Sequence, residues 1–449
     1  MGWKLQRMID RGSLAGTIGA YLTGIVVTSA PWLLTTAVLM SLRIVARQHA
    51  TADFAVIERM LTTIYALTVV LSAPIHVVVS RYTADRMYDQ RLDLIGAPLR
   101  RALALTVGGF AVVGLVLMVV LRVSLGLGIA GTMLTVIVGA QWLMLSVGGG
   151  MSSPLVVLRA FGFGAPLSLF GALVMDRWFG LGAVGYLYGF AAGQLLTLVI
   201  LLHSVARAIP GEVDESARLW PAFKEYRLLA FSALAYYMAI WSDKLVVYLV
   251  VGAEAAALYA AVAALGWFSV IPAFGWIYVQ IETTFYQRFR TFYAALEGGA
   301  PLRQLEANAR VVAQEASRIL RGAALVQAVV TGIALGGAPY LMRLAGLSEV
   351  AVLPFRMAVV GAAMQVITLL EILLLYYFDL RRDALVISVT LFVTETALTL
   401  VCWALGLQPA LGYAFACGLT CTWGAVLVQR RLGTLLVDTF QSQPFGAGI

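Results

Sequence analysis

Asp243 and Lys244 put an acid and a base side by side in the apolar stretch 228–251, which is long enough to cross a bilayer as a helix. A charge in hydrocarbon costs about 3 kcal/mol or more, so such residues normally face a protein interior or a water-filled cavity. Neighbours on a helix point about 100° apart, so we expect the two side chains not to neutralise each other and to find partners elsewhere. The alternative is that both lie near a helix end and extend to the lipid headgroups.

Aromatic residues accompany this pair at helical spacing. Tyr237, Trp241, Lys244 and Tyr248 follow steps of four, three and four residues, so a helix would place them on one face. A cation among aromatic rings suits a hydroxyl-rich chain, because a ring packs against the apolar face of a sugar. We predict that this face lines a translocation path and that Asp243 turns toward a neighbouring helix in a more structural role. Core packing or an interfacial aromatic belt is the alternative for each ring.

Other ionisable residues also lie inside apolar stretches, and three of them are candidates for function. Arg159 and Glu395 are assigned to the same path, and Glu395 and Glu371 are candidates for binding a coupling ion. A lone acid in a span must be protonated and hydrogen-bonded or must lie in a hydrated cavity, because burial disfavours its charged form. Structural hydrogen bonding is the alternative role for these acids.

The elements that position these residues follow from composition. The chain has 449 residues, of which 61% are hydrophobic and only 12% charged, whereas about 25% are charged in soluble proteins. We predict an all-α, polytopic membrane protein of about twelve spans. The predicted spans are 14–42, 57–80, 101–121, 129–147, 151–175, 180–203, 228–251, 256–282, 322–342, 351–378, 384–405 and 409–429.

Motifs for catalysis are missing from the sequence. It has no Walker-type loop, no zinc-ligand cluster and no nucleophile elbow, so we expect no enzyme activity, metal or cofactor. The cysteines Cys402, Cys417 and Cys421 are expected to pack in the apolar interior. The net charge of +8 is attributed to membrane topology rather than to nucleic-acid binding.

The polar segment 206–227 divides the spans six and six. We predict an N-terminal lobe, 1–205, a cytoplasmic linker, a C-terminal lobe, 228–432, and a tail, 433–449. The sequence Gly-Tyr-Leu-Tyr-Gly at 185–189 is echoed by Gly-Tyr-Ala-Phe-Ala at 412–416. The echo favours a parallel repeat of the two lobes about a pseudo-twofold axis along the membrane normal.

Basic residues indicate the orientation. The segments on the side of the N-terminus contain 22 Lys and Arg residues, whereas those on the other side contain seven. Positive charge accumulates in cytoplasmic segments, so we predict that both termini are cytoplasmic.

The cytoplasmic segment 283–321 contains a predicted amphipathic helix, 300–321. Its apolar stripe recurs at three- and four-residue steps and includes Leu302, Leu305, Val312 and Ile319. The stripe could lie on the membrane surface, pack on the helix bundle or dock a cytoplasmic partner. We predict partner docking.

Five stretches together resemble the PelG family, a branch of the multidrug/oligosaccharidyl-lipid/polysaccharide flippase superfamily. One of them carries the cytoplasmic motif residues Arg81, Asp85 and Arg86. The stretches follow the order of the family and are 28–33 (Thr-Ser-Ala-Pro-Trp-Leu), 80–88 (Ser-Arg-Tyr-Thr-Ala-Asp-Arg-Met-Tyr), 240–244 (Ile-Trp-Ser-Asp-Lys), 281–285 (Ile-Glu-Thr-Thr-Phe) and the turn 376–382.

The resemblance implies a flippase-like pair of six-helix lobes with alternating access or a gated channel. It also implies export of a Pel-like exopolysaccharide across the bacterial inner membrane, as the transport subunit of a synthase and secretion complex. The implied partners are a cytoplasmic PelF-like glycosyltransferase, PelD-like and PelE-like membrane companions, membrane lipids and the polysaccharide itself. A lipid-linked oligosaccharide flippase and a non-transporting scaffold for a glycosyltransferase are the alternative functions.

Overall fold

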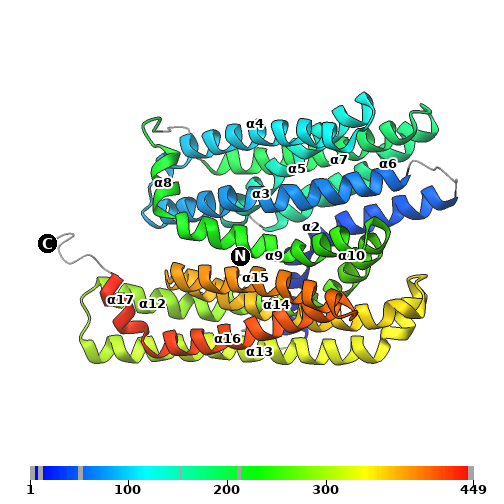
Figure 1. Ribbon diagram of the computed structural model, residues 1–449. Helices are drawn as coiled ribbons and strands as arrows, with labels where there is room; N and C mark the ends of the chain where they lie inside the picture. The colour runs from blue at the N-terminus through cyan, green and yellow to red at the C-terminus, as the bar shows by residue number, and fades with distance from the viewer. Residues whose placement is uncertain (1–5, 9–13, 49–53, 152–153, 210–213, 443–449) are drawn as a thin grey trace. The chain divides into compact units, whose positions relative to one another are not determined.

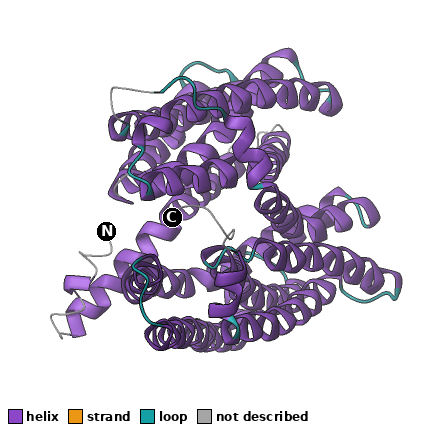
Figure 2. Cartoon of the chain, turned by 90° about the vertical axis from the view of Figure 1, so that its left-hand side faces the viewer, coloured by secondary structure: helices purple, strands orange, loops and turns teal. Residues whose placement is uncertain are grey.

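The structure, a computed structural model, describes residues 6–8, 14–48, 54–151, 154–209 and 214–442, and these contain helices and no strand (Figures 1 and 2). Twelve helical stretches in this part of the chain are long and apolar enough to cross a membrane. The predicted all-α fold with about twelve spans is therefore confirmed, and the chain is a multi-pass membrane protein.

Close contacts divide the chain into two compact units, one of residues 29–237 and the other of residues 1–28 with 238–449. We call them the N-terminal unit and the C-terminal unit. The divisions fall inside two helices, α2 (Leu14–Gln48) and α9 (Arg227–Val250). The predicted lobes, 1–205 and 228–432, remain a prediction from the sequence.

The N-terminal unit contains the rest of α2 and the first part of α9 with six further helices between them. These are α3 (Phe54–Tyr88), α4 (Gly96–Leu121), α5 (Leu125–Met151), α6 (Pro154–Arg177), α7 (Gly182–Ala208) and the short α8 (Leu219–Glu225). Helices α6 and α7 approach closely, because Gly171 and Gly189 have no side chains at the contact. A Cβ at Gly189 would overlap the backbone of Gly171. The glycines at 185, 189 and 193 thus serve tight packing.

The C-terminal unit has the central helix α14 (Val352–Tyr377), which packs against α10 (Ala253–Trp267), α13 (Leu302–Leu344) and α16 (Pro409–Gly433). The other elements are α11 (Ile271–Gln280), a π-helical turn η3 (Ile281–Phe285), α12 (Tyr286–Glu297), α15 (Arg381–Ala404) and α17 (Leu435–Ser442). Most of α14 is buried in this bundle, which lets it carry polar side chains away from lipid.

Helix α13 differs from the sequence-based expectation of an amphipathic helix, 300–321, followed by a separate span, 322–342. It is one helix of 43 residues. At a rise of about 1.5 Å per residue it is about 65 Å long, roughly twice the hydrocarbon core of a bilayer. One part of α13 therefore extends beyond the membrane, and the helix continues without a break between the two parts.

Candidate functional site

A buried charged cluster forms in the C-terminal unit around α9. Lys244 Nζ lies 2.9 Å from Asp243 Oδ1, and the side chains are 13% and 0% exposed. The expectation that these neighbours do not neutralise each other is therefore wrong. The long lysine side chain folds back along its own helix, where Nζ also donates to the Ile240 carbonyl at 2.9 Å, and this brings it to the aspartate.

Asp243 has a second partner on another helix. The Tyr259 hydroxyl of α10 donates a hydrogen bond to Asp243 Oδ2 at 2.8 Å. Asp243 thus faces a neighbouring helix, as the sequence pattern indicated. A buried carboxylate needs such donors, because burial removes the water that would otherwise solvate it.

Lys244 also contacts an aromatic ring, although not one of those predicted from α9. Its Nζ lies 5.3 Å from the ring centroid of Tyr413 on α16, within the range of a cation–π interaction. The Tyr413 hydroxyl in turn donates to Gln365 Oε1 of α14 at 2.8 Å. Sequence reasoning missed Tyr259, Tyr413 and Gln365, although Tyr413 lies in the repeated segment 412–416 and that echo was a signal for it.

Glu395 of α15 completes the cluster. Its side chain is fully buried, and the Asp243 carboxyl is a neighbouring charged group. Among the described residues, no N–H or O–H group donates to either Glu395 oxygen. Two adjacent carboxyl groups and one ammonium are electrically balanced when the carboxyl pair holds one proton, because a second buried negative charge would lack a counter-charge. The arrangement can therefore hold one proton or, in its place, one monovalent cation.

Glu371, the second predicted coupling-ion residue, has different surroundings. It lies on α14, fully buried, and no donor reaches its oxygens in the part of the chain that the structure describes. Its carboxyl group packs directly against Gly424, where an added Cβ would overlap it, and Cys421 is another neighbour. No basic side chain pairs with it among the described residues.

The remaining predicted path residues are not drawn into the cluster. Arg159 is exposed on α6 in the N-terminal unit, so the expectation that it is buried is wrong, and its place in a path remains a prediction. Tyr237 contacts the ring of His76, with centroids 5.7 Å apart. Tyr248 is exposed and Trp241 is partly buried. Of the predicted aromatic face, only Lys244 belongs to the cluster, and a path along that face remains a prediction.

The predicted cytoplasmic motif organises the end of α3. Arg81 Nε lies 3.2 Å from Asp85 Oδ1, and the buried Tyr226 donates its hydroxyl hydrogen to Asp85 Oδ2. Burial and this hydrogen bond raise the pKa of Tyr226 above its usual value. Arg86 forms an ion pair with Asp89 at 3.1 Å.

The stretch 214–227 of the predicted linker packs within the N-terminal unit. Arg100 forms an ion pair with the Glu215 carboxylate, and the Asp214 N–H donates to the Asp93 carbonyl at 3.0 Å. Hydrogen bonds from Ser216 hold the pKa of the Asp214 carboxyl below its usual value. These contacts hold this segment against the helix α4 and the turn before it.

The predicted docking stripe on α13 is covered by the chain itself. Leu305, Val312 and Ile319 are 5%, 0% and 0% exposed, because other helices of the C-terminal unit, α11, α12 and α14 among them, pack against α13. Only Leu302 is exposed, at 60%. The prediction that Leu305, Val312 and Ile319 dock a partner is therefore wrong, and packing on the bundle is the correct alternative.

Comparisons with solved structures place the fold. The chain resembles a multidrug resistance MATE transporter of the MOP superfamily in an outward-facing conformation, with 13% identity, a TM-score of 0.67 and coverage of 94% of this chain and 97% of that chain. It also resembles the Vibrio cholerae MATE transporter VcmN in the bent form, with 14% identity, a TM-score of 0.65 and coverage of 94% and 99%. A MOP superfamily transporter from Pyrococcus furiosus matches at 13% identity, with a TM-score of 0.66 and coverage of 92% and 96%.

The sequence comparisons identify the family. No curated protein matches the chain in sequence. Residues 1–440 match the sequence model of one family, "PelG: Putative exopolysaccharide Exporter (EPS-E)". That match covers nearly the whole chain and agrees with the transporter fold. The chain belongs to the PelG family.

Proposed function

We propose that the chain exports an exopolysaccharide across the bacterial inner membrane as the transport subunit of a synthase and secretion complex. The observation that carries this proposal is the match to the exopolysaccharide exporter family over residues 1–440. The MOP transporter fold supports it, because structures of this fold with matching length are membrane transporters. The chain itself performs no chemical conversion of the sugar in this proposal.

The buried charged cluster is the proposed coupling element. Asp243, Lys244 and Glu395 can exchange one proton for one monovalent cation without leaving an uncompensated charge in the interior. A group that gains and loses a proton in the two states of a transport cycle shifts the balance between those states. We therefore assign the coupling role to Glu395 rather than to Glu371.

The orientation and the partners complete the proposal. Both termini and the segment 283–321 lie in the cytoplasm, on the basis of the 22 to seven excess of Lys and Arg on that side. A PelF-like glycosyltransferase delivers the polymer there, with PelD-like and PelE-like companions in the membrane. Reporter fusions near Glu297 that are active only in the periplasm would contradict this orientation.

Deletion and complementation test the export function. In cells that make the polymer, deletion of the chain should abolish extracellular polysaccharide while the glycosyltransferase remains active in cell extracts. Re-expression of the chain should restore secretion. A lipid-linked oligosaccharide flippase would instead leave an organic-extractable, lipid-linked sugar in the deletion strain. Secretion that continues without the chain would refute both functions.

Cluster variants separate transport from a scaffold role. A scaffold needs only its surface. If the chain is a scaffold, cells carrying Glu395→Gln should therefore secrete the polymer normally as long as the glycosyltransferase co-purifies with the chain. Transport predicts loss of secretion while co-purification persists. The variant Val393→Leu, at an exposed position of the same span, stays apolar as the control and should behave as the wild type in both measurements.

A further inference from the structure

The N-terminal unit has a groove that combines guanidinium groups with apolar side chains. It has a volume of about 520 Å³ and lies between α3, α4 and α8. Its described lining contains two arginines and no acid, so it carries positive charge only. The lining residues are Ile75, Arg101, Leu105, Arg218, Leu219, Trp220 and Phe223.

Arg101 is held in place by neutral groups. Its guanidinium donates to the backbone carbonyls of Glu215, at 3.0 Å, and Ala217. The Glu215 carboxylate is engaged by Arg100, on the neighbouring position of α4. Arg101 is therefore oriented without an acid of its own, which leaves its charge available to an anion. Guanidinium groups suit phosphate, because their planar N–H donors match its oxygens.

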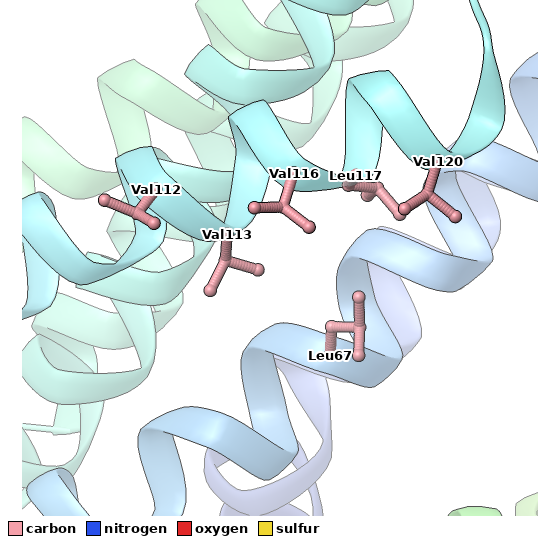
Figure 3. A pocket seen from close by; sticks show the side chains of 6 residues that line it. All are labelled: Leu67, Val112, Val113, Val116, Leu117 and Val120. Carbon is pink, nitrogen blue, oxygen red and sulfur yellow. The ribbon is translucent and has the colours of Figure 1, made fainter.

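A second, wholly apolar furrow runs along the same two helices. It has a volume of about 320 Å³ and is lined by Leu67 of α3 and, on α4, by Val112, Val113, Val116, Leu117 and Val120. Figure 3 shows Leu67 and the α4 side chains on the two sides of this furrow. Val112, Val116 and Val120 are exposed and recur every four residues, so they form one stripe along α4.

The groove and the furrow follow each other along α3 and α4. Seven residues separate Leu105 from Val112, which corresponds to about 10 Å of helix. From Leu105 to Val116 the helix advances about 16 Å, close to the roughly 15 Å thickness of one leaflet's hydrocarbon. The cationic groove is thus followed by the apolar furrow, and Val116 in the furrow lies about one leaflet's thickness from Leu105 in the groove.

We propose that this surface binds an anionic glycerophospholipid of the membrane, with its phosphate at Arg101 and Arg218 and an acyl chain along the furrow of α3 and α4. The charge of the lining selects an anionic headgroup over a zwitterionic one. Trp220, which is 67% exposed, suits the level of the headgroups, where tryptophan is enriched. This proposal is independent of the transported substrate.

Native mass spectrometry of the full chain in detergent tests the headgroup site. Phosphatidylglycerol should bind more tightly than phosphatidylcholine with the same acyl chains. Arg218→Gln should weaken phosphatidylglycerol binding about fivefold, the effect of one basic side chain near an anionic lipid. The matched control is Arg122→Gln, which removes an exposed arginine just past the far end of α4 and should leave binding unchanged. Equal binding of the two lipids, or equal effects of the two variants, would refute the proposal.

A second variant tests the furrow. Val116→Trp fills it with a side chain on an exposed position, so the fold should persist and thermal unfolding should be unchanged. Long-chain phosphatidylglycerol should bind less well to this variant, whereas inorganic phosphate should displace the lipid only weakly from the wild type. If phosphate displaces the lipid completely and Val116→Trp has no effect, the groove takes a soluble anion and the lipid assignment is wrong.

Discussion

The Tyr259 hydroxyl donates to the Asp243 carboxylate at 2.8 Å, and this bond joins α10 to α9 inside the C-terminal unit. Asp243 is simultaneously paired with Lys244 on its own helix and lies next to Glu395 of α15. A single aspartate thus connects three helices of the bundle. The predictions begin from this residue.

Removal of the Tyr259 hydroxyl should destabilise the protein. Tyr259→Phe leaves a buried, charged acceptor with one donor fewer, at a cost of about 2 kcal/mol. The midpoint of thermal unfolding in detergent should fall. Tyr248→Phe, at an exposed position on α9, is the control and should unfold at the wild-type temperature. Identical midpoints for both variants would contradict the hydrogen bond.

The ion pair should behave as a unit. Lys244→Met leaves Asp243 buried without its cation, at a cost of about 3 to 5 kcal/mol, and should reduce the amount of protein in the membrane. Adding Asp243→Asn to this variant should restore much of that amount, because the uncompensated charge is then removed as well. Immunoblots of membrane fractions measure the effect, and a double variant that is worse than Lys244→Met would contradict the pairing.

Glu395 and Glu371 provide a matched pair of buried acids. Glu395→Gln keeps the shape of the side chain but cannot release a proton, so export should fall at least tenfold at normal protein levels. Glu371→Gln should export normally, because no basic side chain pairs with that carboxyl among the described residues. Secreted polysaccharide is the measurement. If the effects are reversed, Glu371 is the coupling residue.

Adjacent valines on α13 test whether its stripe packs inside the chain. Val312→Asp places a charge in a fully buried site and should cost several kcal/mol, about 3 or more, with loss of folded protein. Val311→Asp, at a position that is exposed, should be tolerated. Size-exclusion chromatography of the extracted proteins distinguishes the two. Equal recovery of both variants would mean that the stripe is not covered by the chain.

The contact between Tyr226 and Asp85 should hold the segment 214–227 on the N-terminal unit. Tyr226→Phe should accelerate proteolysis within 206–227, whereas Tyr340→Phe, at an exposed site, should not. Because its pKa is raised above the usual value of about 10, the phenol remains a donor through neutral pH. Its contribution to stability is present below pH 10 and is lost only as pH rises through the folded-state pKa. Protection that is lost between pH 6 and 8 would contradict this.

The sequence alone determined the membrane-spanning architecture. A span needs about 20 consecutive apolar residues, and this requirement is local, so hydropathy predicted the stretch 228–251 where the structure has α9. Hydropathy also separated the predicted amphipathic segment 300–321 from the apolar stretch that follows it. The match to the PelG family rests on the same linear information.

Only the tertiary structure decided which side chains meet. The contacts of Asp243 with Glu395, and of Lys244 with Tyr413, join residues about 150 to 170 positions apart, and they depend on which helices are neighbours and how each is rotated. The sequence also could not show that other helices of the C-terminal unit cover the stripe of α13, because an amphipathic pattern has the same periodicity against any apolar surface. Periodicity defines a face, and packing decides what that face contacts.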